Sequence, residues 1–129
     1  MRVVKQLAVF LENKPGTLAD MCDALAEQGI NIVALTVSDT VDHGVVRMVV
    51  DKPDEATHLL GQGSMMVVES DVVAVQVENR PGSLAALARK CSEADVNIEY
   101  AYCTTGEAES EATLYFRTED PQEAVEALS

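Results

Sequence analysis

The sequence predicts an α+β protein built from two ferredoxin-like βαββαβ units. A seven-residue stretch at residues 12–18 returns in closely similar form at residues 78–84. The motif Ile-Asn-Ile at residues 30–32 returns as Val-Asn-Ile at residues 96–98, at the same offset. Two matches at one spacing indicate an internal duplication. Within each copy, segments with the hydrophobic spacing of a strand and segments with that of a helix follow one another in the order of a split βαβ fold.

The duplication divides the 129 residues into a first unit at residues 1–70 and a second unit at residues 71–129. A unit of this size buries only about 60% of the surface that its unfolded chain exposes, so it is marginally stable alone. We therefore expect the two copies to share an interface or a sheet.

The first unit contains each element of the βαββαβ order. Residues 2–11 alternate between two partly apolar faces, which predicts a strand. Pro15 and Gly16 interrupt it, and apolar residues from Leu18 onward recur at helical spacing. Strands follow at residues 30–38 and 45–51, joined by a turn at 39–44. A helix that opens at Pro53 and a strand at residues 65–69 complete the unit.

The second unit repeats this order and stops early. Strands are expected at residues 72–77, 96–103 and 112–117, helices from Leu84 and at residues 121–128, and a turn at 104–110. We expect antiparallel sheets with the helices on one face, and a second unit that lacks its last strand. Either the chain is truncated, or that edge is open or filled by another segment or another chain. An open edge invites pairing, which favours an oligomer.

Composition excludes several classes of function. The net charge of −13 repels nucleic acid and anionic lipid. The chain contains no apolar run near the roughly 18 residues of a membrane span, and its first residues are charged where a signal peptide would be apolar. The three cysteines form no CxxC pair. Free thiols suit a reducing compartment, so we expect a cytoplasmic protein.

Both copies carry Asn-x-Pro-Gly-x-Leu after the first strand and an Asn-Ile pair at the second. With these duplicated motifs the chain resembles the ACT domain family, small βαββαβ regulatory modules that typically bind amino acids. The resemblance covers nearly the whole chain, and the chain looks like a stand-alone tandem ACT protein. It implies a ligand held where two ACT units meet side by side. The loop after the first strand and the start of the second strand would contact that ligand.

Carried over to this sequence, the implied ligand-binding residues are Leu11, Asn13, Pro15, Gly16, Thr17, Leu18, Asn31, Ile32, Val77, Asn79, Pro81, Gly82, Ser83, Leu84, Asn97 and Ile98. The chemistry suits an amino acid, because the first turn of a helix offers backbone N–H groups to a carboxylate. Asparagine oxygens and strand carbonyls can accept from an ammonium group. Serine-sensing ACT domains carry a histidine two residues before the loop asparagine. Here Leu11 and Val77 hold those positions, which disfavours serine and suggests an apolar side chain.

For several of these residues the sequence allows a structural role as well as contact with a ligand. Asn13 and Asn79 either cap the loop or contact a ligand. Asn31 and Asn97 are poor strand formers at matching strand positions, which favours a ligand or interface contact. The loop glycines either only shape the backbone or also contact the ligand.

The sequence predicts no catalytic residue, no metal site and no cofactor. Thr17 and Ser83 have no histidine partner nearby and are expected to cap their helices. His43 and His58 have no second ligand at metal spacing. An enzyme is therefore the weakest reading.

We expect a regulatory protein that senses a small amino acid at the interface of two ACT units and signals to a separate partner, such as a partner enzyme. A homodimer fits this arrangement. The alternative is a ligand-free adaptor or regulatory subunit of an enzyme of amino-acid metabolism.

Overall fold

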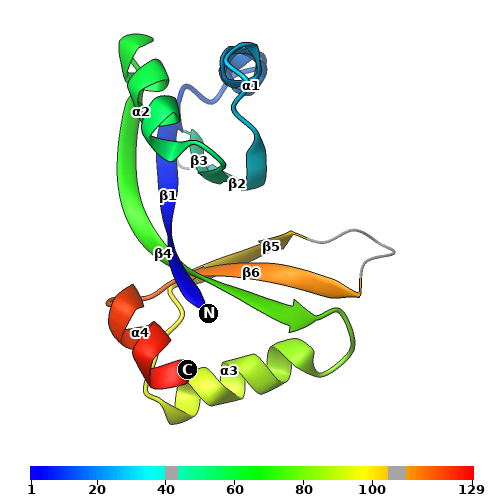
Figure 1. The fold of residues 1–129 in the computed structure, drawn as a ribbon. Helices are drawn as coiled ribbons and strands as arrows, with labels where there is room; N and C mark the ends of the chain where they lie inside the picture. Colours follow the sequence, from blue (N-terminus) through cyan, green and yellow to red (C-terminus); the bar gives the residue numbers. More distant parts are fainter. Residues whose placement is uncertain (40–43, 105–109) are drawn as a thin grey trace. The chain divides into compact units, whose positions relative to one another are not determined.

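A computed structural model describes residues 1–39, 44–104 and 110–129. These residues form six strands and four helices, and they confirm the predicted α+β class (Figure 1). In chain order the elements are β1 (Arg2–Leu11), α1 (Thr17–Glu27), β2 (Ile32–Asp39), β3 (Gly44–Val50), α2 (Pro53–Gln62), β4 (Met66–Glu78), α3 (Ser83–Glu93), β5 (Tyr100–Thr104), β6 (Glu111–Arg117) and α4 (Pro121–Leu128).

The chain forms two compact units. Lys5–Ser70 make up one, called here the N-terminal unit. Asp71–Ser129 make up the other, the C-terminal unit, together with Met1–Val4. The duplicated sequence predicts residues 1–4 in the first unit, whereas in the structure they group with the second. In the sheet order β1 neighbours β4, and the first residues of β1 group with the C-terminal unit.

Strand order in the N-terminal unit is β2-β3-β1-β4, with β2 at one edge. Both β1 and β2 pair with β3 in antiparallel fashion, so β1 and β2 run parallel to each other. Leu11 at the end of β1 and Asp39 at the end of β2 both pair with Gly44. These ends therefore lie at the same end of the sheet, which also carries the Pro-Gly loop.

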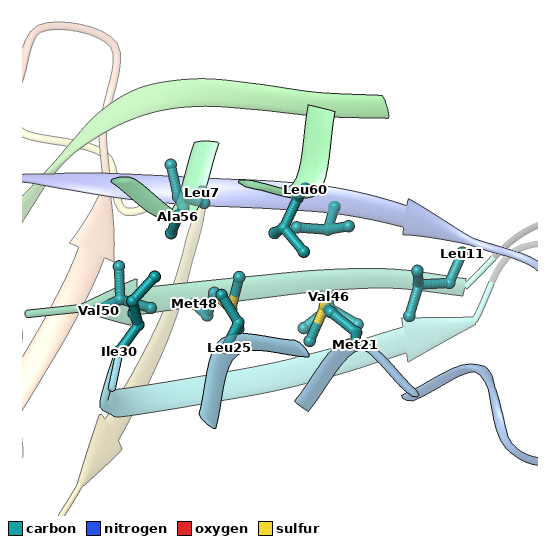
Figure 2. Close-up of a cluster of buried hydrophobic side chains, with 11 residues drawn as sticks. Leu7, Leu11, Met21, Leu25, Ile30, Val46, Met48, Val50, Ala56 and Leu60 are labelled. Carbon is teal, nitrogen blue, oxygen red and sulfur yellow. The ribbon is translucent and has the colours of Figure 1, made fainter. Parts of the chain in front are cut away.

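Both helices of the N-terminal unit cover one face of its sheet (Figure 2). Met21 and Leu25 of α1 pack in one cluster with Ala56 and Leu60 of α2. The strands contribute Leu7, Val9, Leu11, Val46, Met48 and Val50 to that cluster. Full burial of one such leucine or methionine stabilises the fold by about 1.5–3 kcal/mol. This cluster holds the loop and the start of α1 in place.

The C-terminal unit has the same architecture. In it, β6 pairs in antiparallel fashion with both β4 and β5. Leu87 and Cys91 of α3 and Ala124 and Leu128 of α4 pack on the sheet residues Val73, Leu114 and Phe116. Here too both helices lie on one face.

Several expected boundaries differ from the structure. Residues 65–69 and 72–77 were expected to form two strands, but β4 runs through both. The two residues between them, Ser70 and Asp71, are neither glycine nor proline, so the chain does not turn there. The strand expected from residue 96 begins only at Tyr100. The turns expected at residues 39–44 and 104–110 lie largely outside the described residues.

Candidate functional site

The two Pro-Gly loops adopt the same backbone structure. The N–H of Lys14 donates to the Glu12 carbonyl at 2.9 Å, and that of Arg80 to the Glu78 carbonyl at 3.0 Å. Gly16 and Gly82 precede their helices with φ of 96° and 91°. The duplicated sequence therefore produces a duplicated geometry at the predicted site.

Each loop glycine is required by its backbone angle. A positive φ is strained for residues with a Cβ atom, and glycine adopts it without steric cost. A Cβ built on Gly16 would meet no atom within 4 Å, so the surrounding space does not demand a glycine. The positive φ alone therefore explains why glycine stands at both positions.

Thr17 does not cap α1 as expected. Its hydroxyl donates to the carbonyls of Glu12 and Lys14, at 2.8 and 3.1 Å, and so ties the loop to the helix. Gly16 occupies the N-cap position, where it offers no side-chain acceptor to the helix. In the first turn of α1 the N–H of Thr17 donates to the Lys14 carbonyl at 3.5 Å and that of Asp20 to the Gly16 carbonyl at 2.9 Å. The N–H groups between them, of Leu18 and Ala19, have no carbonyl one turn earlier within the helix and suit an anionic group.

An ion pair flanks each loop. Lys14 Nζ lies 2.9 Å from a Glu12 carboxylate oxygen, and Arg80 pairs with Glu78. The Lys14 ammonium holds the pKa of Glu12 below its usual value, and the Glu12 carboxylate raises the pKa of Lys14. The four side chains are largely exposed, so each pair contributes little to stability.

Asn13 reaches a residue that the sequence motif did not identify. Its side-chain amide donates to Asp39 Oδ1 at 2.6 Å. Asp39 ends β2, so the contact joins the loop to the end of the neighbouring parallel strand. In the sequence Asp39 belongs only to a polar turn, and no local signal distinguishes it.

Asn31 is exposed and lies just before β2, so its expected place inside a strand is wrong. Its N–H donates to the Asp51 carboxylate at 2.9 Å, and its carbonyl accepts from the Asp51 N–H at 3.1 Å. Asn97 is also exposed and lies three residues before β5. The argument from poor strand propensity therefore does not apply to either asparagine.

Within one unit, the two groups of predicted site residues lie at opposite ends of the sheet. The Pro-Gly loop follows the end of β1, whereas Asn31 precedes the start of β2, which runs parallel to β1. At about 3.3 Å per residue, the length of β2 separates them by about 23 Å. In the C-terminal unit α3 runs from the loop back to the segment that leads into β5, with the same result (Figure 1). No single unit can place both groups on one small ligand.

The remaining predicted residues divide into core and surface. Leu11 is buried and Val77 packs against the core, so these two stabilise the fold beneath the loops. Ile32 and Ile98 also pack against their cores. Pro15, Pro81 and the two loop leucines are exposed, and Ser83 is half-buried at the start of α3.

A cavity of about 800 Å³ lies beside Asn97, between the residues before β5 and the start of α4. Carboxylates line much of it: Asp95, Glu99, Glu119, Asp120 and Glu123. A smaller cavity of about 380 Å³ touches Asn97 and Ile98 from the α3 side. Neither cavity is lined by residues of the Pro-Gly loops, so these cavities and the loops are separate features.

Among the described residues, no group of three or more histidine, cysteine, aspartate or glutamate side chains could hold a metal ion. His43 lies outside the described residues. No helix in the described part of the chain is both long enough and apolar enough to cross a membrane.

Comparison with known proteins identifies the family. No curated protein matches the sequence. Protein BT0572 from Bacteroides thetaiotaomicron is 35% identical over 98% of this chain and 86% of its own, with a TM-score of 0.90. The regulatory subunits of aspartate kinase from Thermus thermophilus and Thermus flavus, each 19% identical over 99% of this chain and 95% of theirs, share the fold with TM-scores of 0.72 and 0.66. The family model of the ACT domain pair matches residues 2–128, and this chain therefore belongs to that family.

Proposed function

We propose that this protein is a regulatory module that binds a small amino acid where two ACT units meet, and that passes this signal to a separate partner. Its membership of the ACT domain pair family supports a regulatory role. The partner proposed is an enzyme of amino-acid metabolism, because solved proteins of this fold include regulatory subunits of aspartate kinase. The cytoplasmic location stays a prediction from the sequence.

One observation carries the proposal: the predicted binding residues of a unit lie at opposite ends of its sheet. A second unit placed side by side in the antiparallel direction would bring the start of its second strand to the loop of the first. The ligand would then contact the loop of one unit and the Asn-Ile segment of the other. The direction of the strands therefore supports a site at the interface of two units.

The edge strand β2 is suited to such pairing with a second copy of the chain. Among the described residues of the N-terminal unit, no other strand pairs with its outer edge. If Leu35 paired with its own copy on a two-fold axis, the antiparallel register would set Asn31 of the second copy opposite Asp39. Asp39 already holds Asn13. A homodimer of this kind completes two equivalent sites.

The groups gathered at such a site suit an amino-acid zwitterion. The first-turn N–H groups of α1 would bind the carboxylate. The Asp39 carboxylate and the side-chain oxygens of the asparagines would accept hydrogen bonds from the ammonium group. Binding would shift the equilibrium toward the arrangement in which the two units lie side by side, because only that arrangement contacts the whole ligand.

A thermal-shift screen with the twenty amino acids tests this function. A ligand at one hundred times its Kd stabilises the folded protein by about 2.7 kcal/mol. For a chain of this length that corresponds to a rise in Tm of about 10 °C. No shift with any amino acid at millimolar concentration would refute binding and support the ligand-free adaptor.

A complementation experiment tests the interface. Asn13→Ala and Asn31→Ala each remove an exposed side chain and should each abolish binding, whereas Glu27→Ala on the exposed side of α1 should not. Mixing the two defective variants should give heterodimers with one intact site each. Calorimetry should then show one bound ligand per heterodimer, half the number bound by a wild-type dimer. Mixtures that stay inactive, with dimers confirmed by light scattering, would contradict a site shared between copies.

A further inference from the structure

The N-terminal unit leaves apolar side chains uncovered on the helix side of its edge strand β2, from the middle of that strand toward the end near the loop. Leu35 pairs with Met48 and Val37 with Val46, and residues paired across strands point to the same face. Met48 and Val46 lie in the core beneath the helices. Leu35 and Val37 therefore face the helix side, yet they are 40% and 52% exposed because β2 is an edge strand.

Leu18 adds to this surface from the helix. It lies in the first turn of α1, on the same stripe as the buried residues Met21 and Leu25, but it is 37% exposed. Leu18 and Val37 are both near the sheet end where Asn13 bonds to Asp39. The polar pair of the proposed site is thus accompanied by aliphatic side chains on the helix side of the sheet.

The C-terminal unit differs at the equivalent positions. Ala101 pairs with Phe116 and Cys103 with Leu114, both of which belong to its core. Ala101 and Cys103 therefore take the places of Leu35 and Val37 on the helix side of the edge strand. The loop leucine is kept as Leu84. The duplicated loops are alike, and the side chains on the edge strands beside them are not.

We propose that Leu35 and Val37 are specificity-determining residues, and that the site of the N-terminal unit selects an amino acid with an aliphatic or aromatic side chain. This inference rests on the proposed function. An apolar side chain of the ligand would leave water by packing on Leu18, Leu35 and Val37, while the polar groups bind its backbone portion. A serine or aspartate side chain would be desolvated there without a hydrogen-bond partner.

Calorimetric titration of the full chain tests the selectivity, with L-leucine and L-phenylalanine as probes and L-serine and L-aspartate as polar comparisons. One methylene group in an apolar site is worth roughly tenfold or more in discrimination. At least one apolar probe should therefore bind at least about tenfold more tightly than L-serine. Tightest binding of a polar amino acid would overturn the inference and leave the proposed function standing. Failure of all four probes and of the other amino acids would overturn both.

Substitutions assign the selectivity to the edge strand. Leu35→Ala and Val37→Ala should lower the ratio of apolar-probe to L-serine affinity by roughly tenfold. Met66→Ala, which removes a 64% exposed side chain from another strand of the same unit, should leave the ratio unchanged. The ratio separates selectivity from pairing, because a weakened dimer would reduce both affinities alike. An unchanged ratio in Leu35→Ala and Val37→Ala would refute the assignment.

Discussion

The backbone angle of Gly16 allows a quantitative test of the loop structure. Gly16 has φ of 96° and ψ of −23°, and an added Cβ would meet no atom within 4 Å. The cost of Gly16→Ala is therefore conformational only. A left-handed conformation costs a residue with a Cβ about 1–2 kcal/mol. Alanine also lowers the conformational entropy of the unfolded chain, which offsets about 0.4–1 kcal/mol of that cost. We expect a net loss of about 1 kcal/mol in the free energy of unfolding.

Gly61 is a matched control. It lies within α2, and a Cβ there would also meet no atom within 4 Å. Because its φ is not positive, Gly61→Ala should stabilise the protein by about 0.5–1 kcal/mol. The same chemical change should thus have opposite signs at the two positions. Gly16→Asn should lose less than Gly16→Ala, because asparagine tolerates the left-handed region better.

Urea unfolding followed by circular dichroism measures these differences. With a slope of about 2 kcal/mol/M, Gly16→Ala should lower the midpoint by about 0.5 M and Gly61→Ala should raise it by about 0.3–0.5 M, with the slope unchanged. Gly82→Ala should behave as Gly16→Ala does, because Gly82 has φ of 91°. If Gly16→Ala were as stable as Gly61→Ala, the left-handed conformation of Gly16 would be refuted, and with it the common geometry of the two loops.

Three further predictions follow from the structure. Under native conditions Cys103 should react with a thiol reagent first and Cys91 last, as read by mass spectrometry, because Cys103 is exposed and burial raises the pKa of Cys91; fast labelling of Cys91 would contradict its burial. The Glu12 carboxyl should titrate in NMR below an ordinary glutamate, and Lys14→Gln should return it to normal; because the pKa of Glu12 is lowered, the pair's small stabilisation exists above the unfolded pKa and is lost as pH falls through the folded value. Deletion of residues 2–4 should speed amide exchange in the C-terminal unit more than in the N-terminal unit; equal acceleration in both would refute their assignment.

The order of the elements was readable from the sequence because local signals are strong in this chain. A proline opens α2 and another opens α4, and amphipathic spacing marks α1 and α3. Alternation predicts the strands, except that β4 passes the middle of the chain without a break and β5 begins later than expected. Local patterns cannot show whether two apolar runs separated by two polar residues form one strand or two.

The duplicated sequence by itself determined two like folds with two like loops, since the conformation of a Pro-Gly turn before a helix depends on nearby residues. It could not determine which residues meet across the sheet. Asp39 belongs to the candidate site only because strand pairing brings the end of β2 to Asn13. Likewise, only the parallel course of β1 and β2 places Asn31 far from its own loop. Such contacts depend on strand direction and register, which arise from packing between distant segments and leave no signal in the local sequence.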